Sequence, residues 1–249
     1  MLKMGIRMKR QPDVNSPIRE SSTRIPHSTP LPRVLEPEVM DTVDVALAYE
    51  TMDHSGPNAA VVGRLAELGA GGLMLDLGCG PGHIPMAVCE RFADARVLGV
   101  DLSFEMLGLA AARPHERVSL LAADIKRLPF PSHVFDTVYS NTTLHHLPDP
   151  RPFLAEAWRV LKPGGVLLIR DLYRPATIER RDELVNTYAA ENTPLQRQLL
   201  SDSLAAALTP EELLTAARSV GIDRAEVTID SDRHMTLQCV YRPQCGEVR

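Results

Sequence analysis

The sequence predicts an α/β fold built on a doubly wound, mostly parallel sheet. Between about residues 72 and 172, short apolar runs suited to strands alternate with segments of helical periodicity. The runs are continuously apolar, which favours strands buried on both faces. Strands that alternate with helices pair in parallel through right-handed crossovers, so helices cover both faces of one open sheet. With 249 residues, 44% of them hydrophobic, the chain is long enough for one sizeable core.

The first five strands and their connecting helices follow in order along the chain. Two helices are expected ahead of them, at 36–54 with an acidic start and at 58–72 with a glycine-rich end. Strands are then expected at 72–78, 95–101, 117–124, 134–141 and 165–172. The helices between them are expected at 85–94, 103–113 and 152–161, and Ser103 is suited to cap the second of these.

The alternation ends after Asp171. Residues 173–208 resemble two helical segments inserted beyond the fifth strand. Thr209 to Glu212 then provide an N-cap, a proline at the first helical position and a capping-box glutamate, and Gly221 ends that helix. Residues 225–230 and 234–241 predict a closing hairpin whose second strand is antiparallel to its neighbour. We expect one domain over 34–249, with an N-terminal helical extension (34–70) and a helical insert after strand 5 (173–208).

The first 33 residues differ in composition from the rest. They are rich in Pro, Ser and Arg, with seven Lys or Arg against two acidic residues, and contain no apolar block. Too little surface can be buried there to offset the entropy of ordering the chain. We expect a disordered basic tail at 1–33. A transit peptide and an RNA-binding arm are the alternatives.

Bulk charge and composition restrict the partners. The formal net charge of −5 and the isoelectric point near 5.9 provide no basic field for nucleic acid, so DNA is not expected as a partner. The four cysteines lack the spacing of zinc ligands, and no metal site is expected. No apolar stretch is long enough to span a membrane. These features predict a soluble protein of the reducing cytoplasm.

A glycine-rich loop follows the first strand in the stretch LMLDLGCGPG (73–82). The loop after this strand borders the ligand crevice of an open parallel sheet, and glycines there let a ligand approach the main chain. Gly78, Gly80 and Gly82 have the spacing GxGxG, whereas the dinucleotide fingerprint is GxGxxG. Asp76 stands two residues ahead of Gly78. Its carboxylate would repel a pyrophosphate and favour a cation.

Two further acids end the next strands. Asp101 ends the second strand, where a carboxylate can accept hydrogen bonds from both ribose hydroxyls. Asp124 ends the third strand and can accept from the exocyclic amine of an adenine. The inferred ligand has an adenine, a ribose with free hydroxyls, a cationic part and no pyrophosphate.

Five ordered motifs, DLGCGPG, VLGVD, AADIKRLPF, FDTVYSNTTLHHLPDP and LKPGGVLLIRDL, resemble those of the class I S-adenosylmethionine-dependent methyltransferases. The resemblance covers roughly residues 59–242 and is closest to the small-molecule group that includes quinone-biosynthesis and natural-product enzymes. It implies a Rossmann-like, seven-stranded sheet with an antiparallel last strand and S-adenosylmethionine as the cofactor. It also implies methyl transfer to a small-molecule acceptor by in-line displacement.

The resemblance also implies the cofactor-binding residues. Asp76, Gly78 and Gly80 would border the methionine part, Asp101 the ribose, and Asp124 with Ile125 the adenine. Asn141, after the fourth strand, would flank the cofactor from the other side. The complete expected set also includes Cys79 and Leu102 in the first two loops and Tyr49 as part of a lid.

Three residues are candidates for a catalytic base and its partner: His145, His146 and Asp171. The rate of methyl transfer from a sulfonium is raised most by alignment of the nucleophile with the methyl carbon. A catalytic base is needed only where the acceptor must lose an acidic proton. In the family's strand order His145 and Asp171 face the same crevice mouth, where they can meet as a base and its orienter. The alternative is that the two histidines pack the loop or contact the cofactor.

The walls of the site for the methyl acceptor are expected to come from segments around this core. These are the helix with Tyr49 and Met52, the insert with Tyr173 and Tyr188, and the hairpin turn at 232–234. The insert is interpreted as a lid or as the contact of a homodimer.

Other functions stay open at this point. An RNA-modifying methyltransferase is disfavoured by the acidic charge and the 4% aromatic content. An adenine-N6 or glutamine methyltransferase is disfavoured because the fourth strand is followed by NTTL rather than an NPPY-like tetrapeptide. A non-catalytic cofactor-binding assembly partner and a nicotinamide oxidoreductase are the remaining alternatives. The glycine spacing disfavours the oxidoreductase. The acceptor atom is not determined by the sequence.

Overall fold

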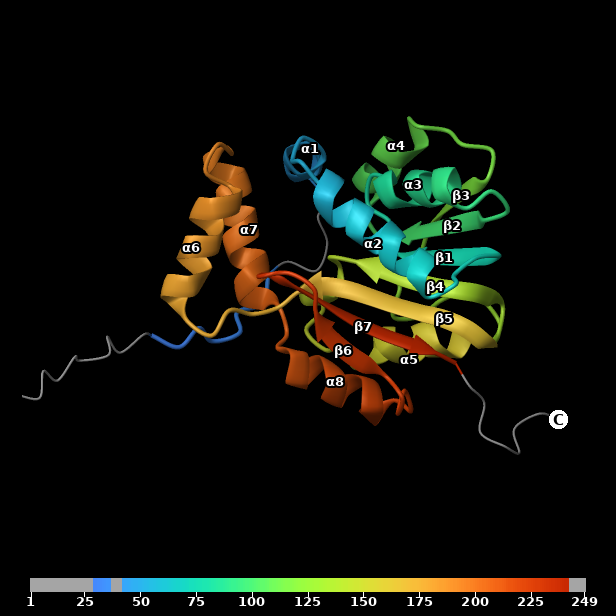
Figure 1. Ribbon diagram of the computed structural model, residues 1–249. Coiled ribbons are helices and arrows are strands. Elements are labelled where there is room, and N and C mark those ends of the chain that lie inside the picture. Colours follow the sequence, from blue (N-terminus) through green and yellow to red (C-terminus); the bar gives the residue numbers. More distant parts are fainter. Residues whose placement is uncertain (1–28, 37–41, 242–249) are drawn as a thin grey trace, which may run out of the picture.

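A seven-stranded sheet forms the centre of the molecule (Figure 1). The computed structural model describes residues 29–36 and 42–241, and the strand order in this part is β3-β2-β1-β4-β5-β7-β6. The strands are β1 (Leu73–Leu77), β2 (Arg96–Asp101), β3 (Val118–Ala122), β4 (Phe135–Asn141), β5 (Leu161–Leu172), β6 (Glu226–Ile229) and β7 (His234–Val240). The predicted seven-stranded, doubly wound sheet is confirmed.

The strand directions also agree with the sequence prediction. Strands β1 to β5 pair in parallel, and β7 is antiparallel to both β5 and β6. The order reverses between β1 and β4, since the chain moves outward through β2 and β3 and then returns to the other side of β1. The carboxyl ends of β1 and β4 therefore border the crevice in which open α/β sheets bind ligands.

Helices cover both faces of the sheet (Figure 1). Helices α2 and α3 pack on one face around Val61, Leu65 and Val88, and α5 and α8 pack on the other around Phe153, Leu154 and Leu213. The helices are α1 (Val43–Glu50), α2 (Ser55–Glu67), α3 (His83–Arg91), α4 (Phe104–Ala111), α5 (Arg151–Val160), α6 (Ile178–Tyr188), α7 (Pro194–Ala206) and α8 (Pro210–Ser219), and the 3₁₀ turn η1 spans Leu144–His146.

The expected insert is a pair of helices, α6 and α7, which stands beside the end of the sheet in orange (Figure 1). Thr177 caps α6, and Thr193 forms a capping box with Gln196 at α7. Leu184 and Leu204 pack between the two helices and Leu172 at the end of β5. The insert thus begins directly beyond the carboxyl end of β5, where it can wall a site.

Residues 29–36, here named the N-terminal strap, lie against this insert. The backbone N–H of Leu31 donates to the Ala176 carbonyl at 3.1 Å, and Arg33 donates to the carbonyls of Leu147 and Ala206 at 2.8 and 2.7 Å. Residues 29–33 were expected in the disordered tail. They are instead attached to the domain, because Leu31 is buried and the Arg33 guanidinium donates to a third carbonyl, that of Pro148, as well. The rest of the expected tail lies outside the described residues.

Several element boundaries differ from the sequence prediction, and α2, for example, spans Ser55–Glu67 where a helix at 58–72 was expected. The expected helix at 36–54 is described only as α1 (Val43–Glu50), and residues 37–41 lie outside the described part. Strand β5 begins at Leu161 rather than at 165. A proline pushes the residue before it toward extended backbone, and Pro163 follows Lys162. The chain therefore leaves α5 in an extended conformation, and Leu161 already pairs with Phe135 of β4. Within the described residues, no helix combines the length and apolarity needed to cross a membrane.

Candidate active site

The loop after β1 depends on glycine at two positions. Gly78 and Gly80 have φ angles of 75° and 50°, in a region of backbone conformation that residues other than glycine rarely adopt. A Cβ on Gly78 would lie 2.4 Å from the side chain of Thr143, so the loop and the segment after β4 are in direct contact there. A Cβ on Gly80 would meet no atom of the chain within 4 Å. The backbone at Gly80 therefore faces open space of the kind a ligand can fill.

Asp101 joins this loop to the end of β2. Its carboxylate accepts from the backbone N–H of Gly80 at 2.8 Å and from that of Ser103 at 2.9 Å. Burial raises the pKa of Asp101, and the backbone hydrogen bonds from Ser103 and Gly80 partly oppose that shift. The side chain is thus a fixed acceptor beside the glycine loop, the position expected of a ribose-binding acid.

A cavity of about 930 Å³ opens beside the loop. Apart from Asp76, all the residues expected to bind the cofactor line it: Tyr49, Gly78, Cys79, Gly80, Asp101, Leu102, Asp124, Ile125 and Asn141. They come from α1 and from the ends of four parallel strands.

Asp76 lies beneath the loop and does not line this cavity. It is 1% exposed, and its carboxylate lies close to the hydroxyl of Tyr139 and to Asp101. Burial, followed by the nearby Asp101 carboxylate, raises the pKa of Asp76 well above its ordinary value. Burial likewise raises the pKa of the Cys79 thiol, which agrees with a packing role rather than a nucleophilic one.

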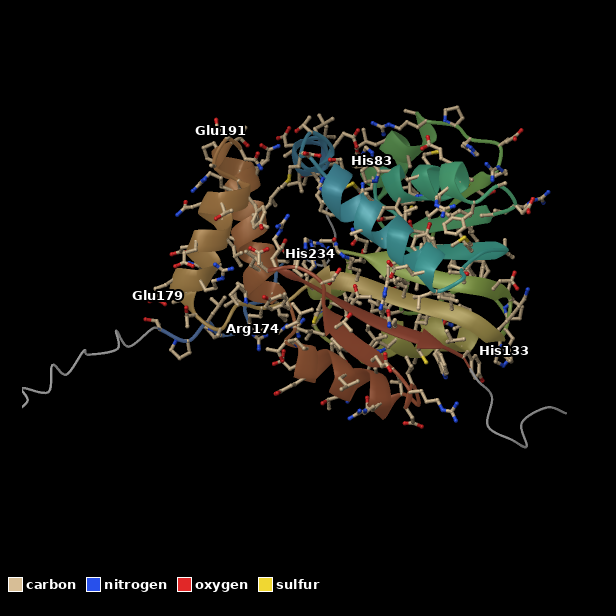
Figure 2. The ribbon with its side chains drawn as sticks, in the orientation of Figure 1. His83, His133, Arg174, Glu179, Glu191 and His234 are labelled. Carbon is tan, nitrogen blue, oxygen red and sulfur yellow. The ribbon has the colours of Figure 1, made fainter. Side chains whose placement is uncertain are left out.

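Helix α1 forms part of the cavity wall through Tyr49. Glu50 at its end pairs with Arg113 and, at 2.8 Å, with His83 of α3, which is labelled in Figure 2. Tyr49 stacks on His54 with ring centroids 4.3 Å apart. Burial, with Asp171 and Asp101, raises the pKa of Tyr49 to about 12, so its phenol is neutral and can donate a hydrogen bond into the site.

A second cavity of about 880 Å³ adjoins the first. The two share Tyr49, His54, Asn141, Thr142 and His146 as walls. The remaining walls come mainly from the segment after α1, the insert and the hairpin turn, including the expected Met52 and Tyr188. Tyr173, also expected there, instead donates its hydroxyl to the Asp232 carbonyl at 2.9 Å and is not a wall residue.

His145 and Asp171 meet as the sequence predicts. The Nδ1 of His145 lies 2.6 Å from Asp171 Oδ1, and both side chains are 2% exposed. The Nε2 of His145 faces a second carboxylate, Glu36 of the N-terminal strap, at 3.1 Å. Burial lowers the pKa of His145, but the two carboxylates outweigh burial and raise it to about 10. Both nitrogens thus face carboxylates, and the expected base at His145 remains a prediction.

Glu36 is the site residue that sequence analysis missed. Its Oε1 also lies 3.2 Å from His146 Nδ1, and the Ser203 hydroxyl donates to it from α7 at 3.3 Å. The sequence provides no local signal for this role, because Glu36 is more than a hundred residues from either histidine and its acidic neighbours suggested a helix start. Only the path of the strap brings it to the cavity.

His234, labelled in Figure 2, lines the second cavity and contributes a neutral hydrogen-bond donor to it. The Ser231 hydroxyl oxygen accepts from the backbone N–H groups of Arg233 and His234, so its own proton is available for His234 Nδ1, 2.9 Å away. Nε2 then carries the ring proton. Burial, with the charges of Arg170 and Arg233, lowers the pKa of His234 to about 3 and keeps the ring neutral.

Comparison with known proteins agrees with this geometry. The family described as "methyltransferase domain" matches residues 75–169, which run from β1 through the glycine loop to β5. This segment of the chain therefore matches a methyltransferase domain, and the sheet has the class I methyltransferase fold. The resemblance inferred from the five motifs is therefore confirmed for the domain and its sheet topology.

Two curated relatives share this methyltransferase segment. Trans-aconitate 2-methyltransferase of Deinococcus radiodurans is 41% identical over 97 residues, which cover 39% of this chain and 36% of the relative. The 27-O-demethylrifamycin SV methyltransferase of Amycolatopsis mediterranei is 37% identical over 131 residues, 49% of this chain and 47% of the relative. The matched part thus spans less than half of each relative.

Solved structures extend the likeness to the fold of most of the chain. A plantazolicin methyltransferase in complex with a triazolic desmethylPZN analogue and SAH superposes with a TM-score of 0.65 at 14% identity, over 80% of this chain and 92% of that one. Haemonchus contortus phosphoethanolamine N-methyltransferase 2 in complex with S-adenosylhomocysteine superposes with a TM-score of 0.61 at 21% identity. The superposition covers 82% of this chain and 58% of that one.

Proposed function

We propose that the protein transfers a methyl group from S-adenosylmethionine to a small-molecule acceptor by in-line displacement. The observation that carries the proposal is the pair of adjoining cavities. The first contains the glycine loop and Asp101, and the second is enclosed by the insert. Their common walls mark the place where a methyl donor in one meets an acceptor in the other.

The residues of the first cavity fit the cofactor. The open space beside Gly80 admits the methionine part against the main chain, and Asp101 offers acceptors to the ribose hydroxyls. Asp124 and Ile125 lie at the end of β3, where they can hold the adenine. The bound cofactor would supply the activated methyl group. The chain's own residues would hold that group in line with the acceptor and exclude water.

The second cavity favours a small acceptor with oxygen atoms. Arg233 and the Nε2–H of His234 provide hydrogen-bond donors on one of its walls. Arg233 is held by its guanidinium over the ring of Tyr188, 3.3 Å from the centroid. Small-molecule names among the relatives, such as trans-aconitate and rifamycin, support the same class. The expected homodimer and a cytoplasmic location remain part of this proposal.

Transfer of labelled methyl groups tests the proposal. We expect label from S-adenosylmethionine to reach at least one member of a panel of small acids, phenols, amines and thiols, and to appear in the small-molecule fraction by mass spectrometry. The control is an Asp101→Ala variant on the same panel. Label in RNA instead would favour an RNA-modifying enzyme, and cofactor binding with no labelled product would favour the non-catalytic assembly partner.

A further inference from the structure

We propose that Glu36, His145 and His146 bind one divalent first-row transition-metal ion at the wall of the second cavity. The three side chains offer one carboxylate oxygen and two imidazole nitrogens, all within 4.8 Å of one another. Two imidazoles and a carboxylate are ligands that ions such as Zn²⁺ and Fe²⁺ accept. No metal was expected from the sequence, because the ligands come from distant segments with no recognisable spacing.

The distances suit a shared ion. Glu36 Oε1 lies 3.1 Å from His145 Nε2 and 3.2 Å from His146 Nδ1. Two ligand atoms about 2.0–2.2 Å from one tetrahedral ion are about 3.3–3.6 Å apart, so small side-chain shifts suffice to admit it. The ion would take the place of the proton that lies between His145 and Glu36, and that proton would leave to solvent.

Asp171 provides the supporting contact that metal-binding histidines usually have. It accepts from Nδ1 of His145 at 2.6 Å, which leaves Nε2 directed at Glu36. Asp171 is itself fixed by the backbone N–H groups of Leu172 at 2.6 Å and of His145 at 3.2 Å. The ring of His145 is therefore held in one orientation before any ion arrives, and its Nδ1 would keep its proton when Nε2 loses the other.

Charge and access agree with the proposal. Glu36 and Asp171 are two carboxylates with side chains only 6% and 2% exposed, and an ion between the histidines would offset them. Three protein ligands leave coordination positions open, as in catalytic rather than structural sites. His145, His146 and Ser203 line the second cavity, so an acceptor can reach those positions. The ion would lower the pKa of a bound hydroxyl or thiol. This role rests on the proposed function, whereas the site itself does not.

Titration of the full-length chain, free of any histidine tag and dialysed against EDTA, with Co²⁺ alone tests the site. We expect one Co²⁺ per chain with visible d–d absorption. Asp171→Asn should weaken binding about 10- to 100-fold, and Glu36→Gln and His146→Gln by more than that. His115→Ala, on a surface turn before β3, is the matched control and should leave binding unchanged.

Two results would overturn the metal site. One is the absence of stoichiometric Co²⁺ binding by the wild-type chain, which would leave the cluster as a hydrogen-bonded network. The other is binding that survives Glu36→Gln and His146→Gln, which would place the ion elsewhere. The experiment contains neither cofactor nor acceptor, so its failure is distinct from failure of the proposed methyl transfer. Calorimetry with S-adenosylmethionine on the same EDTA-treated protein tests that function separately.

Discussion

Replacement of Asp101 by Ala is expected to weaken S-adenosylmethionine binding about 30- to 150-fold. The carboxylate is the acceptor we assign to the ribose hydroxyls, and it also holds Gly80 and Ser103 through their backbone N–H groups at 2.8 and 2.9 Å. Loss of buried hydrogen bonds to a charged group costs about 2–3 kcal/mol, which corresponds to that change in affinity. Isothermal calorimetry with the cofactor alone measures it.

Asp94→Ala is the control for Asp101→Ala. Asp94 is an exposed acid in the turn just before β2, so its loss changes the net charge by the same amount without touching the cavity. Unchanged affinity in Asp94→Ala and a large loss in Asp101→Ala would support the assigned contact. Equal affinities in the two variants would show that Asp101 does not contact the cofactor.

Removal of His145 is expected to cost about 3–5 kcal/mol of folding free energy in EDTA-treated protein at neutral pH. The imidazolium is the cation that faces both Asp171 and Glu36, at 2.6 and 3.1 Å, and its loss removes the charge that the two buried carboxylates share, although Glu36 keeps its contacts with His146 and Ser203. Urea denaturation of His145→Ala against the wild type measures this loss. With an acceptor in hand, the same variant should lower turnover and leave cofactor affinity nearly unchanged.

A second substitution separates charge from packing at His145. In the double variant His145→Ala with Asp171→Asn, one of the unpaired charges is gone, so part of the lost stability should return. His115→Ala is the control for removal of a histidine that lies outside the cluster. A loss below about 1 kcal/mol in His145→Ala, or no recovery in the double variant, would contradict the assigned charge pairing.

Local patterns predicted most of the fold and the cofactor cavity. The alternation of apolar runs and helical segments predicts parallel strands joined by right-handed crossovers, and the family resemblance supplies the strand order. The strand ends then place Asp101, Asp124 and Asn141 at one rim. Asp76 lies beneath the loop rather than in the cavity wall, because successive strand residues alternate between faces and this carboxylate stands two residues before Gly78. Its expected contact with the methionine part stays a prediction.

Fewer of the contacts around the second cavity could be predicted from the sequence. The meeting of His145 with Asp171 follows from the adjacency of β4 and β5, which the motifs imply. Glu36 reaches the same cluster only because Leu31 and Arg33 attach the strap to the insert, a long-range contact with no periodic signal. The tautomer of His234 depends on three hydrogen bonds within one turn, which composition and spacing do not reveal.

Calorimetric titration of the wild-type chain with S-adenosylmethionine and, separately, with NAD tests the central claim most directly. A GxGxG loop without a pyrophosphate site, joined to Asp101, should bind one S-adenosylmethionine per chain and release no heat of binding with NAD. Saturable binding of NAD, or no binding of S-adenosylmethionine to the folded protein, would contradict it.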